Sequence, residues 1–139
     1  MWIRVLLLVV LLARIGGAQG ATGQLGRSGE AICGRASASD SSGVVVGVVR
    51  DARSRAPLAG SVVSAEWLEL TVNRGGFIRR VPRLADTTAE NGWFVLCDVP
   101  SPATIDLAAS RGADSTDVIE ARVPAEGVLR RDLYLGAAR

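Results

Sequence analysis

Short stretches of alternating apolar and polar residues follow one another from Gly43 to Leu135, and none of them carries a helical period. Alternation with a period of two is typical of β-strands that have one buried face. Glycine and proline separate the stretches at intervals of about ten to fifteen residues, as expected for strands joined by turns. The pattern predicts an all-β chain, folded as an antiparallel β-sandwich of about seven strands. The expected strands are residues 43–51, 61–72, 77–88, 93–100, 103–109, 115–123 and 128–135.

Three details of the pattern predict departures from regular strands. Gly47, inside a run of valines, indicates a bulge or the close approach of another backbone segment. The alternation changes phase after Trp67, which favours a bulge or a strand that passes the edge of a sheet. Pro82 lacks an amide donor, so we expect residues 77–81 to form an exposed edge strand. The phase of the apolar residues predicts a core that contains Val46, Val48, Val63, Trp67, Phe94, Leu96, Ile105, Leu107, Ile119 and Leu133.

The clearest turn signal lies between residues 87–88 and the alternating stretch 93–100. Glu90-Asn91-Gly92 suits a tight turn, because Asn tolerates a left-handed backbone and Gly adopts one without steric cost. We therefore expect a β-hairpin here. Phe94 points to the core in this hairpin, and the outer face holds Trp93, Val95 and Cys97.

The first twenty residues have the composition of a secretory signal peptide. Arg4 gives a positively charged start, residues 5–13 are an unbroken apolar run, and small residues allow cleavage after Ala18 or Gly20. A membrane anchor is the alternative, but this run is well short of the roughly twenty residues that a transmembrane helix needs. The expected organisation is a signal peptide at 1–20, a flexible lead-in at 21–42 and one β-sandwich domain at 43–136.

The charge balance gives no indication of a nucleic-acid partner. All sixteen basic residues are arginines, fourteen acidic residues oppose them, and there is no histidine. Loss of residues 1–20 would remove two of the arginines and leave a neutral chain. Nucleic-acid binding requires a clustered basic face, whereas the densest group, Arg79, Arg80 and Arg83, is typical of a solvated strand. We expect an exported protein, in the periplasm, on the outer-membrane surface or secreted, that touches a membrane only through its signal peptide.

Several short segments resemble the carboxypeptidase regulatory-like domain, a family with a transthyretin-like or prealbumin-like, carbohydrate-binding-like fold. In that family a strand that ends in Asp is followed by a Pro-Leu-x-Gly-Ala-x-Val loop and then by Thr-Asp-x-x-Gly-x-Phe-x-Leu-x-x-Val-Pro. Ser61 stands where the family has Ala, and Thr88 stands where it has Asp. The segments that carry the resemblance are residues 47–51, 57–63, 87–88, 92–96 and 99–100.

The resemblance covers residues 43 to 135 and implies a seven-stranded prealbumin-like sandwich that is mostly non-catalytic. Modules of this family accompany carboxypeptidases, surface adhesins and outer-membrane receptors. A shared fold does not transfer a function. What the resemblance implies is therefore a structural or protein-binding accessory of the cell envelope.

Cys33 and Cys97 are the sharpest chemical feature of the sequence. Two cysteines in an exported chain, with no histidine to complete a metal site, favour a disulfide. Cys97 lies in the outward phase of its strand, so a lead-in segment that crosses that face could reach it. Two buried free thiols and an intermolecular link are the alternatives.

The composition argues against an enzyme, a metal site and a cofactor. Without His or Lys, neither a Ser–His nor a Ser–Lys arrangement can form. A zinc site would have to be assembled from scattered carboxylates. A glycosidase-like carboxylate pair stays conceivable, and its candidates, by proximity alone, are Asp114 with Asp117 and Glu66 with Glu69.

Two binding hypotheses remain. The first is an envelope protein partner, held by the loops at the ends of the sandwich around residues 51–58 and 111–116. The second is a glycan that stacks on Trp93 and Tyr134, the two aromatic residues in outward phase. The alternative for these two rings is that they cover the outer face of the sheet or pack beneath the Cys33 segment.

Overall fold

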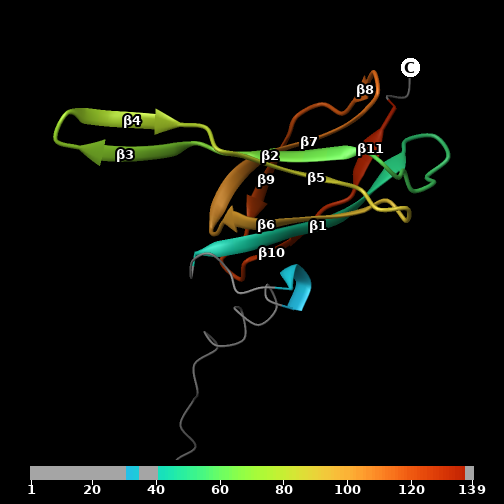
Figure 1. Cartoon of the computed structure of the whole chain (residues 1–139), viewed down its shortest axis with the longest axis horizontal. Helices are drawn as coiled ribbons and strands as arrows, with labels where there is room; N and C mark the ends of the chain where they lie inside the picture. The colour runs from blue at the N-terminus through green and yellow to red at the C-terminus, as the bar shows by residue number, and fades with distance from the viewer. Residues whose placement is uncertain (1–30, 35–40, 137–139) are drawn as a thin grey trace, which may run out of the picture.

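The structure is a computed structural model that describes residues 31–34 and 41–136 (Figure 1). Within these residues one helical turn, 31–33, precedes a chain built from β-strands. This confirms the all-β prediction, although the strands are shorter and more numerous than expected. They are β1 (Ser42–Asp51), β2 (Val62–Glu66), β3 (Glu69–Asn73), β4 (Gly76–Arg80), β5 (Arg83–Thr87), β6 (Trp93–Pro100), β7 (Ala103–Arg111), β8 (Asp114–Ser115), β9 (Ile119–Val123), β10 (Val128–Arg130) and β11 (Leu133–Leu135).

The first sheet is centred on β1, which pairs with β6 in antiparallel and with β10 and β11 in parallel. Val44 pairs with Val128 and Val49 with Leu133, so β11 continues the register that β10 begins. The two short strands therefore occupy one edge of β1, opposite β6. They are interrupted where the Asp132 carboxylate, rather than a backbone carbonyl, accepts the hydrogen bond from the Val48 N–H (3.1 Å).

The second sheet has the order β5-β2-β7, and β8 and β9 lie along the free edge of β7. It packs over the first sheet, and Figure 1 shows the two layers with β2, β5 and β7 on one side and β1, β6 and β10 on the other. Side chains from both layers form a single core. Its buried members are Val45, Val49, Val63, Ala65, Phe94, Leu96, Val99, Ile105, Leu107, Ala109, Val123, Leu133 and Leu135.

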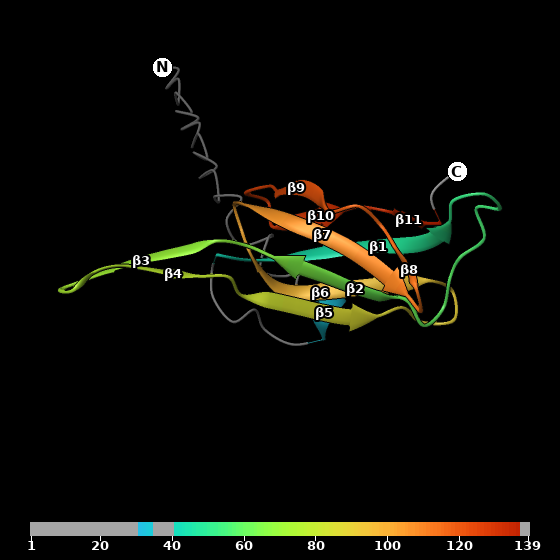
Figure 2. The same ribbon diagram turned by 90° about the horizontal axis from the view of Figure 1, so that it is seen from above.

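A third sheet, the β3–β4 ribbon, projects away from this two-layered body (Figures 1 and 2). The predicted strand 61–72 is thus two strands, and its change of phase after Trp67 marks the point where the ribbon leaves the body. Residues 77–81 form the return arm of the ribbon rather than an edge of the body. The Trp67 N–H donates to the Pro82 carbonyl (3.3 Å) and closes the base of the ribbon.

The predicted core is correct except on β1. Val46 and Val48 point to the outer face of the first sheet, and the core side of β1 carries Val45 and Val49 instead. Val48 is buried on its own face, so β1 is covered on both sides. Trp67 and Ile119 are partly buried at the margin of the core.

The predicted hairpin around Gly92 is wrong. β5 and β6 belong to different sheets, so residues 88–92 carry the chain from one layer to the other. The Asp86 carboxylate fastens this corner, because its Oδ2 accepts a hydrogen bond from the Val95 N–H (3.0 Å). The turn itself is as predicted, with Gly92 at φ 76° and its N–H donating to the Ala89 carbonyl (2.9 Å).

The residues that resemble the family motif hold one end of the body together. Buried Thr88 donates its hydroxyl to the Leu58 carbonyl (2.6 Å) and accepts a hydrogen bond from the Ser61 N–H (2.9 Å). The Val49 N–H donates to the Gly92 carbonyl (2.9 Å). Leu58 packs against the core. These hydrogen bonds and this packing connect the loop 57–61 and the turn 88–92 to β1.

Cys33 and Cys97 form a disulfide with their Cα atoms 6.2 Å apart, and it ties the helical turn 31–33 to the outer face of β6. Cys97 lies opposite Val44, and a bulge follows it at Asp98, which has a positive φ of 63°. Before the bulge the buried residues of β6 are Phe94 and Leu96. The extra residue changes the phase of the strand, so that Val99 is buried after it. A disulfide is consistent with an oxidising, exported environment.

Reduction of this disulfide should lower the free energy of unfolding by about 2–4 kcal/mol. The bond closes a loop of 64 residues, and the chain-entropy model assigns about 4 kcal/mol to a loop of this length before any loss through native-state strain. Denaturant unfolding with and without reductant measures the difference. The Cys33→Ser/Cys97→Ser variant is the control, because reductant should not change its midpoint. An unchanged midpoint for the reduced native chain would show that the bond adds no stability.

Candidate functional site

Trp93 and Tyr134 lie on the same outer face, that of the first sheet, and are 42% and 43% exposed. Trp93 pairs with Val48, whereas Tyr134 pairs with Arg50 on the other side of β1. The strand β1 therefore separates the two rings. The structure brings them to one face but does not place them side by side.

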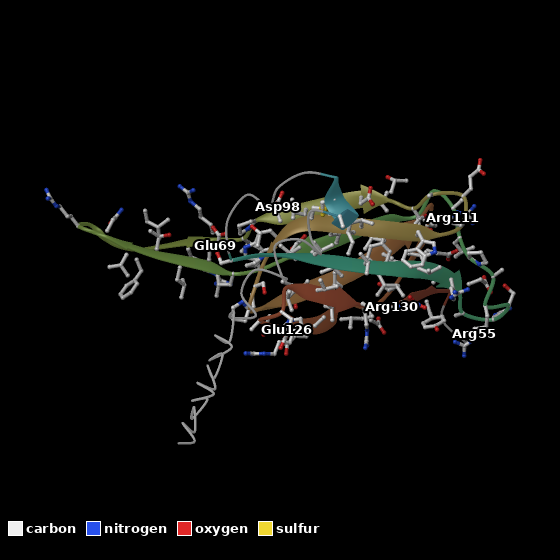
Figure 3. All side chains as sticks on the ribbon, turned by 90° about the horizontal axis from the view of Figure 1, so that it is seen from below. Arg55, Glu69, Asp98, Arg111, Glu126 and Arg130 are labelled. Atoms are coloured by element: carbon white, nitrogen blue, oxygen red, sulfur yellow. A yellow bond between two sulfur atoms is a disulfide. The ribbon has the colours of Figure 1, made fainter. Side chains whose placement is uncertain are left out.

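Arginines fill the space around Tyr134. The guanidinium of Arg55 lies over the Tyr134 ring, 4.7 Å from its centroid. Arg50 donates to the Arg55 carbonyl (3.2 Å) and pairs with Asp132 (3.7 Å). Figure 3 shows Arg55 at the end of the body that is far from the ribbon. Since Arg55 covers one face of Tyr134, that face is closed to a sugar ring.

The four carboxylates considered as catalytic candidates are either bound to other side chains or exposed. Glu66 pairs with Arg83 across the strands (3.3 Å), while Glu69 accepts a hydrogen bond from the Trp67 indole N–H (3.0 Å). Each carboxylate thus has its own partner. Asp114 and Asp117 are both exposed on the connection between β7 and β9.

The loop 51–58 is held by its own hydrogen bonds. Asp51 Oδ1 accepts from the backbone N–H groups of Ser54 (2.7 Å) and Arg53 (2.9 Å) and from the Ser54 hydroxyl (3.1 Å). These donors lower the pKa of the Asp51 carboxyl below its ordinary value. The exposed turn at residues 111–114 lies at the same end of the body, where β7 meets β8. Most residues of both loops proposed as partner surfaces are exposed, and the first loop is stabilised by its internal hydrogen bonds.

The largest departure from an ordinary protein surface is one face of the β3–β4 ribbon. Val72 pairs with Phe77 and Leu70 with Arg79, and alternate residues of a strand share a face. Leu68 and Val81, which flank the two strands, continue the same alternation. We call these side chains the apolar face; their exposed fractions are Leu68 52%, Leu70 64%, Val72 69%, Phe77 81% and Val81 55%.

The opposite face of the ribbon is mixed and polar. It carries the cross-strand pairs Glu69 with Arg80 and Thr71 with Ile78. Arg79 is the single charged residue on the apolar face, and Arg74 lies in the turn at the tip. The side chains of Arg74, Arg79 and Arg80 are all exposed. In Figure 3 the ribbon's side chains stand out on both sides, beyond the position of Glu69 at its base.

The apolar face is not among the surfaces predicted from the sequence. Its signal was present as two apolar alternations, 68–72 and 77–81, placed symmetrically about the turn Asn73-Arg74-Gly75-Gly76. Symmetry of this kind indicates a hairpin with one apolar face. Because the arginines and Pro82 suggested an exposed edge strand, the two arms were assigned to different parts of the sheet.

In the part of the chain that the structure describes, no three His, Cys, Asp or Glu side chains gather in a way that could hold a metal ion. Among residues 31–34 and 41–136, no helix has the length and apolarity needed to cross a membrane. Neither a protein-family model nor a curated protein sequence matches this chain.

Proposed function

We infer that this chain is a non-enzymatic, exported binding module that docks onto a component of the cell envelope through the apolar face of its ribbon. One observation carries the proposal. Five large apolar side chains, each more than half exposed, share one face of a projecting hairpin. Contiguous exposed apolar patches of this kind mark interaction sites, because a monomer gains nothing by keeping them in water.

The shape of the molecule supports this function. The ribbon extends beyond the body, so its face can meet a second surface without interference from the two sheets (Figure 2). The hydrogen bonds of the body leave no buried side-chain N or O atom unsatisfied among the described residues.

The body fits a seven-stranded prealbumin-like sandwich of the carboxypeptidase regulatory-like type. β8 with β9 and β10 with β11 each share one edge, so the strands outside the ribbon occupy seven positions. The structural role of the motif residues around Thr88 supports the same assignment. The disulfide supports export to the periplasm, the outer-membrane surface or the medium.

Glycan binding through Trp93 and Tyr134 is the second candidate. Their shared face and partial exposure favour it. A stacking platform requires open ring faces, however, and here Arg55 covers one face of Tyr134 while β1 separates the two rings. The ribbon offers a larger uncovered apolar surface, so we place docking first.

A matched pair of ribbon variants tests the docking function. Val72→Ser/Phe77→Ser removes one cross-strand pair from the apolar face, and Thr71→Ser/Ile78→Ser removes the neighbouring pair from the opposite face. The first variant should reduce co-sedimentation with an isolated envelope fraction at least about tenfold, since each buried apolar side chain contributes about 1.5–3 kcal/mol. The second should retain binding to within about threefold.

Both variants should melt close to the native protein, because exposed side chains change stability by about 0.5 kcal/mol or less. A folded Val72→Ser/Phe77→Ser variant that still co-sediments like the native chain would refute docking through the apolar face.

A further inference from the structure

We propose that the apolar face of the ribbon docks onto an anionic lipid surface, with Arg74, Arg79 and Arg80 at the level of the lipid headgroups. The inference rests on the proposed function and names the partner of the same site. The ribbon has an apolar face bordered by charged side chains. A bilayer interface likewise has an apolar layer bordered by charged headgroups. In the ribbon that charge is positive, so the complementary surface is negative.

The net charge of the ribbon favours an anionic lipid surface over a protein partner. Residues 68–82 contain three arginines and one glutamate, a net charge of +2. Arg79 lies on the apolar face itself, and the cross-strand register places no acidic residue on that face. A protein surface that covered the face would need a carboxylate opposite Arg79. A lipid bilayer instead allows the long arginine side chain to reach the headgroups while its aliphatic part stays apolar.

The shape of the ribbon allows it to lie flat in the plane of a membrane interface. Amphipathic segments lie in the plane of the interface with their apolar face about 5–10 Å deep. A two-stranded ribbon can do this, because the unpaired N–H and C=O groups along its two outer edges remain in the hydrated headgroup layer. The opposite face, with Glu69, Thr71 and Arg80, would lie at the hydrated level of the lipid headgroups. The ribbon stands clear of the body, as a planar partner requires (Figures 1 and 2).

A second copy of the chain fits the surface less well. If two ribbons packed apolar face to apolar face in parallel, Arg79 would lie near the Arg79 of the other copy. In either arrangement, parallel or antiparallel, each Arg79 would be buried between two apolar faces that carry no acidic residue, which is unfavourable.

Protein-free vesicles test the proposal. The exported protein, with its disulfide intact, is mixed with vesicles of phosphatidylcholine alone or of phosphatidylcholine with phosphatidylglycerol, and the bound fraction is measured by flotation. Binding should require phosphatidylglycerol and should weaken as salt is raised. Val72→Ser/Phe77→Ser should lower the partition constant at least about tenfold.

Two arginine variants separate the ribbon from the rest of the protein. Arg79→Gln/Arg80→Gln should weaken binding to the anionic vesicles by about fivefold for each charge removed. Arg111→Gln/Arg130→Gln removes the same charge from the body, away from the ribbon (Figure 3), and should leave the partition constant nearly unchanged.

The possible failures are distinct. Binding to the envelope fraction but to neither kind of vesicle would assign the site to an envelope protein, which overturns this inference and leaves the proposed function standing. Equal binding to both kinds of vesicle would overturn the charge argument. A dimer in sedimentation equilibrium that Val72→Ser/Phe77→Ser abolishes would assign the face to a second copy. Binding to neither vesicles nor the envelope fraction would overturn both proposals.

Discussion

Gly47→Ala should destabilise the protein by about 3 kcal/mol or more, at or above the upper end of what extra atoms in a filled interior usually cost. A Cβ atom at Gly47 would lie 1.8 Å from the carbonyl oxygen of Arg131 and 2.9 Å from the Phe94 ring. The first contact is with backbone, which cannot turn aside as a side chain can. The segment of Arg131 between β10 and β11 would have to leave β1, and the parallel edge of the first sheet would open.

Gly75→Ala is the matched control for this prediction. A Cβ atom at Gly75 would meet only the Asn73 carboxamide oxygen, at 3.4 Å, so the change in the free energy of unfolding should stay within about 0.5 kcal/mol. Chemical denaturation of both variants measures the two effects. If Gly47→Ala unfolded at nearly the same denaturant concentration as the native chain, the close packing of Arg131 on β1 would be incorrect.

Gly47 also shows how far sequence reasoning reaches. A glycine inside a valine run predicted either a bulge or a close backbone approach, and the structure shows the approach, with the bulge elsewhere, at Asp98. Turn positions were predictable because a turn depends on the conformational preferences of a few neighbouring residues. Gly92, for example, adopts the left-handed conformation that its Asn-Gly signal favours. What a turn connects was not predictable, because the choice between a hairpin and a crossing to the second sheet depends on distant strands.

The phase of β1 could not be read from its sequence. Valines occupy both even and odd positions from Val44 to Val49, so the pattern lacks the polar residues that would identify the outer face. In the structure both faces of the strand are covered, and Val45 and Val48 are each buried on opposite sides. In β6 the predicted phase is confirmed, since Phe94 and Leu96 are buried and alternate with less buried residues.

The candidate site was the least predictable part of the molecule. An apolar side chain in a strand is ordinarily taken as buried, and only the tertiary structure shows that Leu70 and Phe77 lack any covering layer. The same sequence could have placed these arms on the body. The ribbon projects because the chain leaves β2 after Glu66 and returns at Arg83, where the pair Glu66 with Arg83 closes its base.

Phe94→Ala should lower the free energy of unfolding by about 3–5 kcal/mol, as the loss of a large buried aromatic side chain does. Phe94 is 1% exposed and packs in the core between the two sheets. Its removal leaves a cavity beside Gly47, where the backbone of Arg131 already lies close and limits any collapse around the space.

The chain contains one other phenylalanine, and it provides the control. Phe77 is 81% exposed on the ribbon, so Phe77→Ala should change stability by no more than about 0.5 kcal/mol. The identical substitution at the two positions thus separates burial from residue type, and calorimetric or denaturant unfolding of the pair measures it. Equal effects at the two positions would contradict either the burial of Phe94 or the exposure of the ribbon. A large loss at Phe77 alone would mean that the apolar face is packed against the protein itself, and the docking surface would then not exist.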